Sequence, residues 1–515
     1  MSTAATGISI RRAEGGLDRI DLWHRILLWV LVTVGFETIL YFADWWLEPH
    51  HRKNMVFFVF LTFAVMWGPF RALYNWFNVL FIRGGPGGSA PEGLKVDVYT
   101  TAMPGEPYEM FEKSLTAIAS LRYPHESYLL DGGNDARLRQ LCERLRIHHV
   151  DSREIKGAKA GKINHALTRT SGEFILVIDP DHVPEPDFLD KVLPPFRDAE
   201  VGFVQVVQGY SNQGESFVAR ASAEQTYGFY GPTMMGMNGL GTAVAIGANC
   251  TFRRKALEEI GGHAVNLAED LLTSMRLHAG RWKSIYVPQR LSFGLTPADL
   301  HSYFKQQLKW STGMFGVFFS HYFRHFRNLT LPQKVHYFFA GTYYLEGPAI
   351  AVTCILPIVF LFFGLWAVEM DFGEFLIHIT PFVTMSILIG WFVQRWYRDR
   401  SEKGFLWRGM FLKKGTWPIY VLGLAYCLTR TRVPYLPTPK TADRNVYTSL
   451  VVPHLTVMGL SAAAVVYALL SYDRFVIGTR LMMFFAACNI VLMLPTVLVA
   501  HAPWFERRKR AGAAQ

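Results

Sequence analysis

Six long apolar stretches constrain this chain more than any other feature of its sequence. They lie at residues 22–46, 56–81, 337–368, 375–396, 451–470 and 481–501. A helix needs about 20 apolar residues to cross a bilayer, so each stretch is long enough to span one. Trp23, Trp46 and Trp396 near the ends of stretches suit the membrane–water interface. The sequence therefore predicts a protein that crosses the lipid bilayer about six times.

Basic residues predict how these helices are oriented. The formal net charge is +11, and much of the excess follows apolar stretches, as at Arg395, Arg400 and 507–510. Because cytosolic segments are enriched in Lys and Arg, we expect both termini and the segment between the second and third helices to be cytosolic. This placement argues against nucleic acid as a partner. It predicts the plasma membrane, which is the inner membrane of a bacterium, and the long first stretch argues against a signal peptide.

Between the second and third stretches the pattern becomes that of a globular domain. A Gly- and Pro-rich linker at 84–91 precedes it. Short β-rich runs lie at 96–101, 128–130, 174–178 and 201–207, with helical patterns at 109–120 and 135–145. This alternation predicts an α/β domain with a mainly parallel sheet, which binds ligands at the carboxyl ends of its strands.

The chain is thus expected to divide into seven segments. They are 1–83 with two transmembrane helices, 84–299 with the globular domain, 300–335 with interfacial helices, 336–400 with helices three and four, 401–447 with an interfacial segment and a polar loop, 448–505 with helices five and six, and a basic tail at 506–515.

Two carboxylates follow the run at 174–178, in Asp179-Pro-Asp181. Carboxylates at a strand end suit Mg²⁺ or Mn²⁺, which would bridge the diphosphate of a nucleotide sugar and neutralise the leaving group. An isolated pair of this kind is more often a solvated part of a loop. An apolar strand precedes the pair and His182 follows it. Both features favour the metal site, but they do not decide between it and a solvated loop.

Asp131 and Lys159 are candidates for nucleotide contacts. Asp131 follows a strand and opens Asp-Gly-Gly-Asn, so it would either accept hydrogen bonds from a base or cap a turn, two interpretations of equal weight. Lys159 opens Lys-Ala-Gly-Lys before a predicted helix, which suits a diphosphate, although a solvated lysine pair is commoner.

Acidic and aromatic residues further along suit glycosyl transfer. The reaction needs a base for the acceptor proton, and Glu269-Asp270 heads a predicted helix, where an N-terminal cap is the alternative. Lys309 suits a phosphate and Trp310 offers a face for a sugar ring. A Trp/Lys pair at a membrane interface is the plainer interpretation of these two.

The order of these motifs resembles that of processive family 2 glycosyltransferases, which include bacterial cellulose synthase catalytic subunits and related β-glucan synthases. The likeness runs from about residue 96 to 445. It implies a GT-A domain inserted in the transmembrane bundle. By this resemblance the substrate would be bound by Thr100, Glu106, Asp131, Lys159, Gly161, Asp179, Gln306, Lys309 and Trp310, the metal by Asp179 and Asp181, and the acceptor by Tyr230, Asn249 and Trp310, with Asp270 as the base beside Glu269.

The polar loop carries the most specific part of the resemblance. Tyr435, Thr438 and Lys440 match the loop that closes over the nucleotide in cellulose synthases, which implies a β-glucan product. Two departures qualify this. Lys309 stands where the family's QxxRW has arginine, and the two are not equivalent at a bidentate phosphate site. Residues 204–208 lack the family's Thr-Pro-His, which leaves β-1,3, mixed-linkage and β-1,4 products open.

The resemblance implies a processive, inverting membrane enzyme that polymerises a β-glucan from UDP-glucose with Mg²⁺ or Mn²⁺. The growing polysaccharide would cross the membrane through the helices, and accessory subunits are possible partners. The chain ends soon after its last apolar stretch, so cyclic-dinucleotide activation is not expected from this chain alone. The alternatives are a non-processive enzyme making a glycolipid, a synthase of another β-linked polysaccharide, and a non-enzymatic membrane scaffold.

Overall fold

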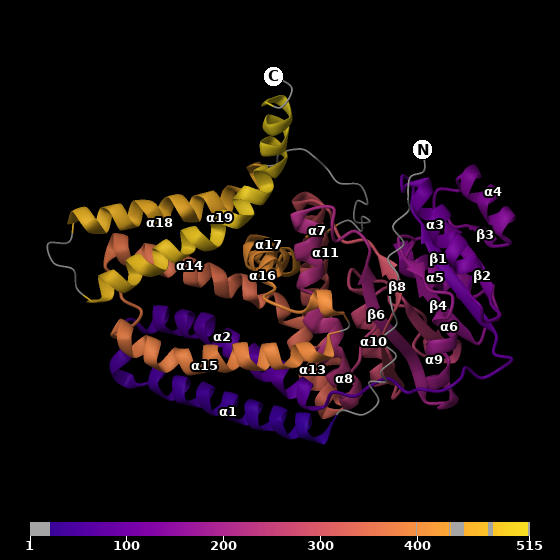
Figure 1. Ribbon diagram of the computed structural model, residues 1–515, viewed down its shortest axis with the longest axis horizontal. Helices are drawn as coiled ribbons and strands as arrows, with labels where there is room; N and C mark the ends of the chain where they lie inside the picture. Colours follow the sequence, from indigo (N-terminus) through magenta and orange to yellow (C-terminus); the bar gives the residue numbers. More distant parts are fainter. Residues whose placement is uncertain (1–20, 398, 432, 434–447, 472–476, 513–515) are drawn as a thin grey trace, which may run out of the picture.

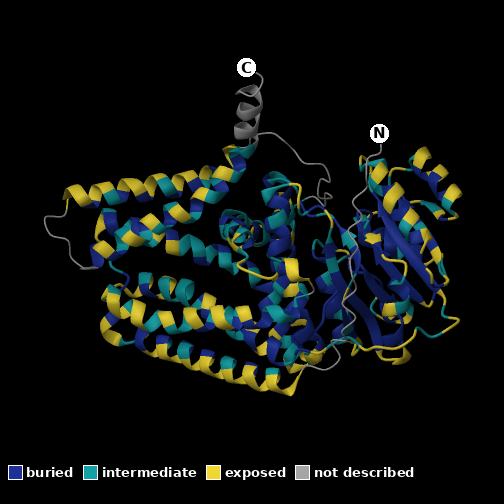
Figure 2. Cartoon of the chain, in the orientation of Figure 1, coloured by how far each residue is buried: buried dark blue, intermediate teal, exposed yellow. Residues whose placement is uncertain are grey.

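The computed structural model describes residues 21–397, 399–431, 433, 448–471 and 477–512. An α/β domain lies beside a bundle of long helices (Figure 1). Exposed residues cover the outer faces of the bundle helices, and the sheet lies buried inside the α/β domain (Figure 2). The predicted combination of a mixed α/β domain and a helical membrane bundle is therefore confirmed.

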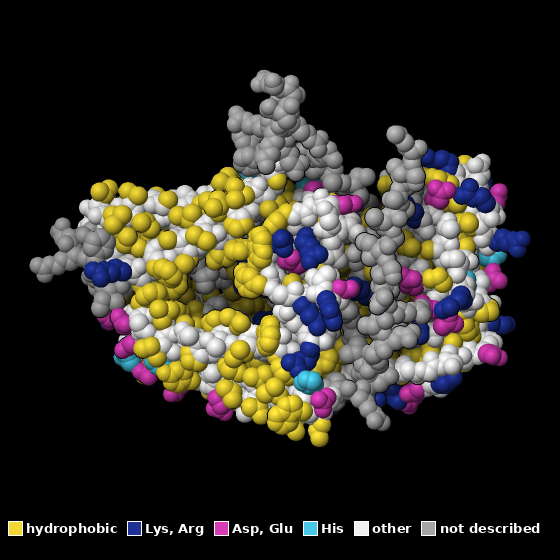
Figure 3. Space-filling model, viewed as in Figure 1, with side chains coloured by type: hydrophobic (Ala, Val, Ile, Leu, Met, Phe, Trp, Pro, Cys, Tyr) yellow, Lys and Arg dark blue, Asp and Glu magenta, His cyan; other side chains and the backbone are white. Residues whose placement is uncertain are grey.

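Six helical segments are long and apolar enough to cross a membrane. They comprise α1 (Leu22–Trp46), α2 (Met55–Leu80), Tyr343–Phe363 with α14 (Glu346–Phe363), Phe372–Trp396 with α15 (Phe372–Val393), Thr448–Ser471 with α18 (Val452–Ser471), and Gly478–Ala502 within α19 (Ile477–Gly512). Hydrophobic side chains cover much of the bundle surface in view, and charged ones gather on the α/β domain and at its junction with the bundle (Figure 3). This distribution is that of a multi-pass membrane protein, whose lipid-facing surface is apolar.

The third apolar stretch is shorter than predicted. Residues 337–368 divide into the end of a separate helix, α13 (Leu331–Gly341), a turn, α14 and a loop. Gly364 ends α14 because its φ of +65° lies in the left-handed region, a common helix terminator. The hydropathy of the sequence does not distinguish an apolar turn from an apolar helix.

The α/β domain is built on an eight-stranded sheet. The strands are β1 (Val96–Ala102), β2 (Glu126–Asp131), β3 (His148–Asp151), β4 (Phe174–Ile178), β5 (Val183–Pro184), β6 (Val201–Tyr210), β7 (Cys250–Arg253) and β8 (Lys283–Gly294), in the order β3-β2-β1-β4-β7-β6-β8-β5. Strands β1 to β4 are mutually parallel, and so are β6 and β8. Because β7 is antiparallel to both β4 and β6, the two groups run in the same direction, and the sheet is mainly parallel as predicted, with β5 and β7 running the opposite way.

Strand β7 runs antiparallel between β4 and β6. The chain leaves β6 at the carboxyl edge of the sheet and passes through α7 (Phe217–Glu224) and α8 (Met234–Leu240). It re-enters at the same edge, because Cys250 pairs with Val177 near the end of β4. A strand that enters there has to run backwards, since only a crossover would return the chain to the opposite edge.

Two hydrophobic cores enclose the sheet. Helices α3 (Tyr108–Ala119) and α4 (Ala136–Leu145) pack on one face with α6 (Phe188–Val192), while α5 (Ala158–Leu167), α9 (Arg254–Glu259) and α10 (Glu269–Ala279) pack on the other. All seven residues of β1 and all five of β4 are buried. Polar residues at the carboxyl ends of these strands are thereby held on a rigid scaffold.

Helix α11 (Leu300–Val317) lies at the junction between the sheet and the bundle (Figure 1). A side chain at Gly313 would come within 2.8 Å of the backbone nitrogen of Ala268, just before α10. Buried Leu272 and Met275 of α10 share one hydrophobic core with Tyr337 and Trp396 from the bundle side. The start of α10 and the residues of α11 therefore keep a fixed relation to the membrane helices. The segment 401–447, predicted to contain an interfacial part, includes α16 (Trp407–Gly415) and α17 (Trp417–Leu428).

Candidate active site

Strand β4 delivers two carboxylates to the carboxyl edge of the sheet. Possible ligand atoms of Asp179, Asp181 and His182 lie within 4.8 Å of one another. Asp181 is buried, and its Oδ2 accepts a hydrogen bond from the backbone of Leu295 at 3.2 Å. Asp179 is more open, with its side chain 31% exposed. Of the two sequence-based interpretations, the solvated loop pair does not fit a carboxylate as buried as that of Asp181.

Lys159 lies between the carboxyl edge of the sheet and the candidate catalytic acids of α10, Glu269 and Asp270. Its ammonium contacts Oδ1 of Asp179 and the carbonyl of Gly247, and the side chain is 9% exposed. Burial alone would lower the pKa of Lys159, but attraction to Asp179, Glu269 and Asp270 outweighs it and raises the pKa. The solvated-lysine interpretation is therefore excluded.

Gly161 and Lys162, on the same helix, are held by close contacts. A side chain at Gly161 would collide with the carbonyl of Lys156, so only glycine allows this tight first turn of α5. The ammonium of Lys162 donates to the carbonyl of Ala102 at 2.6 Å, at the end of β1. Both residues keep α5 close to the sheet edge that carries the acids.

Glu269 and Asp270 occupy the first turn of α10, and the N-cap is Ala268, which makes no side-chain cap. Asp270 accepts a hydrogen bond from the backbone of Leu271 at 2.7 Å. Burial, with the charge of Asp270, raises the pKa of Glu269 to about 7, and burial also raises the pKa of Asp270. A carboxyl whose pKa is raised by burial holds a proton more strongly, which favours general base catalysis. Neither acid is the N-cap residue, although the carboxylate of Asp270 does accept from a backbone donor of the first turn.

A glycine separates the two groups of acids. Gly247 has a φ of +84°, and a side chain there would stand 3.4 Å from Oδ2 of Asp270 and 3.9 Å from Oε1 of Glu269. Its carbonyl accepts the hydrogen bond from Lys159 on the other side. Glycine therefore lets the backbone approach the acid pair, and it links this pair to the cation that contacts Asp179.

Helix α11 brings Lys309 toward the same acids. Burial lowers the pKa of Lys309, and attraction to Glu269, Asp179 and Asp270 partly offsets this. Trp310 is 39% exposed. Gln306 is half-buried, whereas its neighbour Gln307 is buried and accepts a long hydrogen bond of 3.4 Å from Tyr420. The structure thus gathers Lys159, Asp179, Glu269, Asp270 and Lys309 in one electrostatic cluster.

A pocket of about 610 Å³ lies beside α11. It is lined by Asn266, Leu267, Thr312, Gly313, Gly316, Ser320, Tyr426, Cys427, Arg430, Thr431 and Val433. Residues 309, 312, 313 and 316 recur at helical spacing, so the pocket lies on the face of α11 that carries Lys309. Its wall at Asn266 and Leu267 directly precedes the acid pair in the chain.

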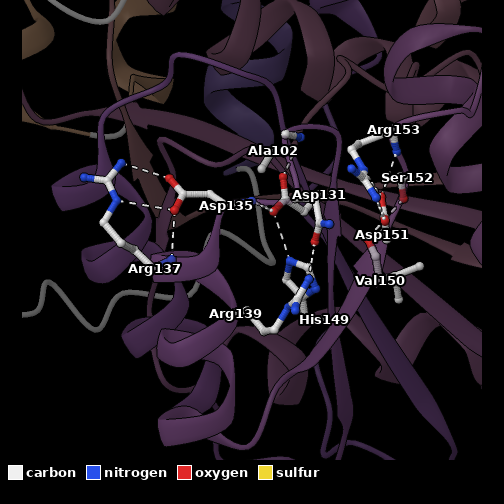
Figure 4. Close-up of polar contacts among 12 residues, drawn as sticks. Ala102, Asp131, Asp135, Arg137, Arg139, His149, Val150, Asp151, Ser152 and Arg153 are labelled. Carbon is white, nitrogen blue, oxygen red and sulfur yellow. Dashed lines mark hydrogen bonds and ion pairs between the residues drawn. The ribbon is translucent and has the colours of Figure 1, made fainter.

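Asp131, a predicted base-binding residue, ends β2 and lies close to His149 (Figure 4). Asp131 is 1% exposed and accepts hydrogen bonds from the backbones of Gly133 and Asp135, at 2.7 and 2.8 Å. Nε2 of His149 lies 2.9 Å from the same carboxylate. The turn-capping interpretation of Asp131 is thereby confirmed, and His149 is a neighbour that the sequence patterns did not reveal.

Thr100 and Glu106 also have partners within the fold. The Thr100 hydroxyl is buried and donates to the carbonyl of Ile178 at 3.2 Å. Glu106 accepts a hydrogen bond from the backbone of Met103 at 2.8 Å and so closes the turn after β1. Both residues shape this end of the sheet, and contact with a base stays a prediction for each.

The predicted acceptor residues adjoin the metal candidates. The Tyr230 hydroxyl donates to Oε1 of Gln208 at 3.1 Å, and Nε2 of Gln208 lies 3.1 Å from Nε2 of His182. The other ring nitrogen of His182, Nδ1, lies 3.5 Å from Oδ1 of Asp181. Gln208, at the position where the sequence departs from cellulose synthases, thus connects Tyr230 to the acids of β4.

Asn249 is fully buried with a φ of +57°. Neither its amide nitrogen nor its amide oxygen has a hydrogen-bond partner among the described residues. A buried amide in this state costs on the order of 1–3 kcal/mol per group unless a ligand or water satisfies it. The predicted residues Tyr435, Thr438 and Lys440 lie outside the described part of the chain.

Comparison with known proteins identifies the domain that holds this site. A family model described as Glycosyltransferase like family 2 matches residues 116–313, and one described as Cellulose synthase matches residues 258–408. Residues 116–313 are thus similar to the family 2 glycosyltransferase domain. Both models include the acid pair of α10 and most or all of α11, so the glycosyltransferase domain extends to the membrane junction.

The curated proteins similar to this chain include cellulose synthases. The chain is 37% identical over 168 residues to a UDP-forming cellulose synthase catalytic protein from Dictyostelium discoideum, covering 31% of this chain and 16% of that protein. It is 30% identical over 246 residues to the UDP-forming cellulose synthase catalytic subunit of Komagataeibacter sucrofermentans, covering 46% and 32%. The chain thus spans a third or less of the length of these two relatives.

A solved structure shares the fold of the glycosyltransferase. A mannosyltransferase from Pyrobaculum calidifontis, in complex with GDP-mannose and Mn²⁺, aligns with a TM-score of 0.51 and 16% identity. The alignment covers 73% of this chain and 99% of that one. The predicted GT-A fold is therefore confirmed, and at this identity the likeness concerns the fold alone.

Proposed function

We propose that this glycosyltransferase polymerises a β-glucan from UDP-glucose and passes the chain outward through its membrane helices. The glycosyltransferase domain and both termini would be cytosolic, in the plasma membrane or the inner membrane of a bacterium. The relatives are named UDP-forming cellulose synthases, which supports a UDP-sugar donor and a glucan product. Accessory subunits are compatible with this proposal.

One observation carries the proposal: Lys159 contacts both Asp179 and the carbonyl of Gly247, whose backbone adjoins Glu269 and Asp270. Asp179 belongs to the predicted donor site, whereas Glu269 and Asp270 belong to the predicted base site. In a sugar transfer the anomeric carbon is bonded to the donor diphosphate while the acceptor hydroxyl approaches the same carbon, so the two binding sites must adjoin. The lysine and the glycine lie between the two predicted sites and so keep them next to each other.

The donor residues fit a divalent cation. Asp179 and Asp181 offer carboxylate oxygens, the ligands that Mg²⁺ and Mn²⁺ prefer, and His182 lies beside them. When bound, such a cation supplies positive charge to the departing diphosphate. Lys159 and Lys309 add two cations of the chain itself, and Gly161 keeps the start of α5 close to this position.

At the acceptor, Asp270 takes the proton from the attacking hydroxyl. That oxygen bonds to the anomeric carbon from the face opposite the diphosphate, the carbon–oxygen bond to UDP breaks, and UDP leaves with the bonding electrons. An α-linked donor then gives a β-linked product. Tyr230, Asn249 and Trp310 would hold the terminal sugar of the growing chain, and Gln306 would support the same helix.

We assign the remaining donor contacts to residues at the edge of the site. Thr100, Glu106 and Asp131 would shape the uracil pocket, with His149 held by Asp131. Tyr435, Thr438 and Lys440 would close over the diphosphate. Gln208 stands where cellulose synthases have a histidine, and it contacts Tyr230. This replacement favours a β-1,3 or mixed linkage, with β-1,4 as the alternative.

Donor specificity tests the proposal. Protein purified with its membrane helices in lipid nanodiscs is given radiolabelled UDP-glucose, UDP-galactose, UDP-N-acetylglucosamine or GDP-mannose, each with Mg²⁺ or Mn²⁺ or with a chelator. We expect polymer from UDP-glucose alone, and none with the chelator. Polymer from another donor would correct the sugar, whereas lipid-linked mono- or disaccharides would support the non-processive alternative.

A further inference from the structure

The turn between α1 and α2 gathers two histidines and a glutamate. It reads Glu48-Pro-His50-His51 and lies at the end of both helices that is remote from the glycosyltransferase domain, since α1 leads to it and α2 leads back. Figure 3 shows acidic and histidine side chains gathered at the corresponding end of the bundle. None of these residues takes part in the proposed sugar transfer.

The three side chains converge. Nδ1 of His50 lies 3.1 Å from Oε2 of Glu48, and the rings of His50 and His51 are 4.1 Å apart between centroids. One possible ligand atom from each of the three residues lies within 4.8 Å of the other two. Donor atoms bound to one metal ion are separated by distances of this order, because each stands about 2 Å from the ion.

His51 supplies an independent indication of a ligand. It is 1% exposed, and neither ring nitrogen has a hydrogen-bond partner among the described residues. Trp45 packs against its ring, with centroids 4.7 Å apart. A buried imidazole left in this state costs on the order of 1–3 kcal/mol, and a metal bound to one nitrogen would remove part of that cost.

We propose that Glu48, His50 and His51 form a binding site for a Zn²⁺-like transition-metal ion. Two imidazoles and one carboxylate suit zinc, which accepts nitrogen and oxygen ligands and often keeps one position for water. Mg²⁺ and Ca²⁺ prefer sites made of oxygen atoms alone. The site therefore differs in metal preference from the carboxylate pair of β4.

A metal here would stabilise the turn between α1 and α2, which backbone hydrogen bonds already connect to the loop between α14 and α15. The backbone nitrogen of Glu369 donates to the carbonyl of His51 at 3.0 Å, and that of Asn54 donates to the carbonyl of Trp366 at 3.1 Å. Lys53 also forms an ion pair with Glu369. The metal would order the far end of the bundle and raise its thermal stability.

The test measures zinc binding by the full-length protein in nanodiscs, purified with a tag that contains no histidine. The parent protein carries Asp179→Asn and Asp181→Asn, which remove the carboxylate pair of β4. Zinc is titrated by calorimetry, and bound metal is counted after gel filtration. Glu48→Gln and His50→Ala alter exposed side chains and are expected to fold, whereas His51→Ala is a third variant at the buried position.

We expect the parent to bind one zinc ion per chain and to melt at a higher temperature with zinc. Glu48→Gln and His50→Ala should each weaken binding by about tenfold or more, as loss of groups at metal sites does. His24→Ala, at the opposite end of α1, is the matched control and should bind like the parent. Absence of zinc binding by the parent, or unchanged affinity in both variants, would overturn the proposal.

Discussion

The ammonium group of Lys159, on α5, is bonded to the carboxylate of Asp179, which directly follows β4. The two residues lie on separate elements of the sheet edge, and Lys159 has a raised pKa because nearby carboxylates outweigh its burial. The lysine therefore stays charged at neutral pH. A fixed cation beside a predicted metal ligand is suited to stabilise a departing diphosphate.

Replacement of Lys159 by methionine tests that role. Loss of one fixed charge at a reacting group typically lowers kcat by about 10²- to 10³-fold, and we expect a fall of this order in polymer synthesis. Lys156→Met is the matched control, because Lys156 lies just before α5 with an exposed side chain. Rates are measured as UDP release. A Lys159→Met enzyme as fast as the control would remove Lys159 from the mechanism.

Asp270→Asn tests the assignment of the base. Asparagine keeps the shape of the side chain but cannot take the acceptor proton, so polymer synthesis should fall at least about 10²-fold. UDP binding, measured by calorimetry, should change little. Glu109→Gln, an exposed acid in the first turn of α3, serves as the control. Near-normal polymer yield from Asp270→Asn would exclude Asp270 as the base.

Glu269 predicts a pH dependence of stability. Burial raises its pKa from the ordinary value of 4.5 to about 7, so between these values the folded chain binds more protons than the unfolded chain. Stability therefore falls as the pH rises through this interval, by up to roughly 3 kcal/mol, and the loss is complete above pH 7.

Glu269→Gln removes this proton linkage. The melting temperature of the variant relative to the unmodified protein should therefore increase between pH 5 and pH 8. Scanning calorimetry or fluorescence melting in nanodiscs measures the difference. A constant difference across this range would mean that the Glu269 carboxyl has no raised pKa.

We expect replacement of Gln208 to affect the acceptor site and not donor binding. Its amide bonds Tyr230 and His182, and two such bonds contribute about 1 kcal/mol each. Gln208→Leu should slow polymer extension about tenfold or more and alter the linkage ratio, with the KM for UDP-glucose unchanged. Gln140→Leu, on the exposed face of α4, is the control. A changed KM with unaltered linkages would place Gln208 at the donor instead.

Much of the architecture could be predicted because its causes are local. Apolar length alone reveals membrane helices, and β4 was predicted with the observed bounds because a short apolar run ends abruptly at Asp179. Strand direction depends on where the chain re-enters the sheet. Antiparallel β7 therefore had no sequence signal, and neither did the turn that shortens the third span.

The candidate site was predictable as a set of residues, but its contacts were not. Strand ends and helix starts reveal Asp179 and Glu269 because such positions converge at one sheet edge. The partners of Asp131 and Gln208 depend on side-chain directions in three dimensions. His149 was missed for the same reason, since it stands in no motif that requires its residue type.

The most direct test is the product made by the purified protein from UDP-glucose alone. Sealed vesicles with outward-facing glycosyltransferase domains are incubated with radiolabelled UDP-glucose, and the product is sized by gel filtration and digested with linkage-specific β-glucanases. We predict a long β-glucan that is protected inside the vesicles until detergent is added and is then degraded by one or more of these enzymes. Short lipid-linked sugars, or polymer that resists every β-glucanase, would contradict this account.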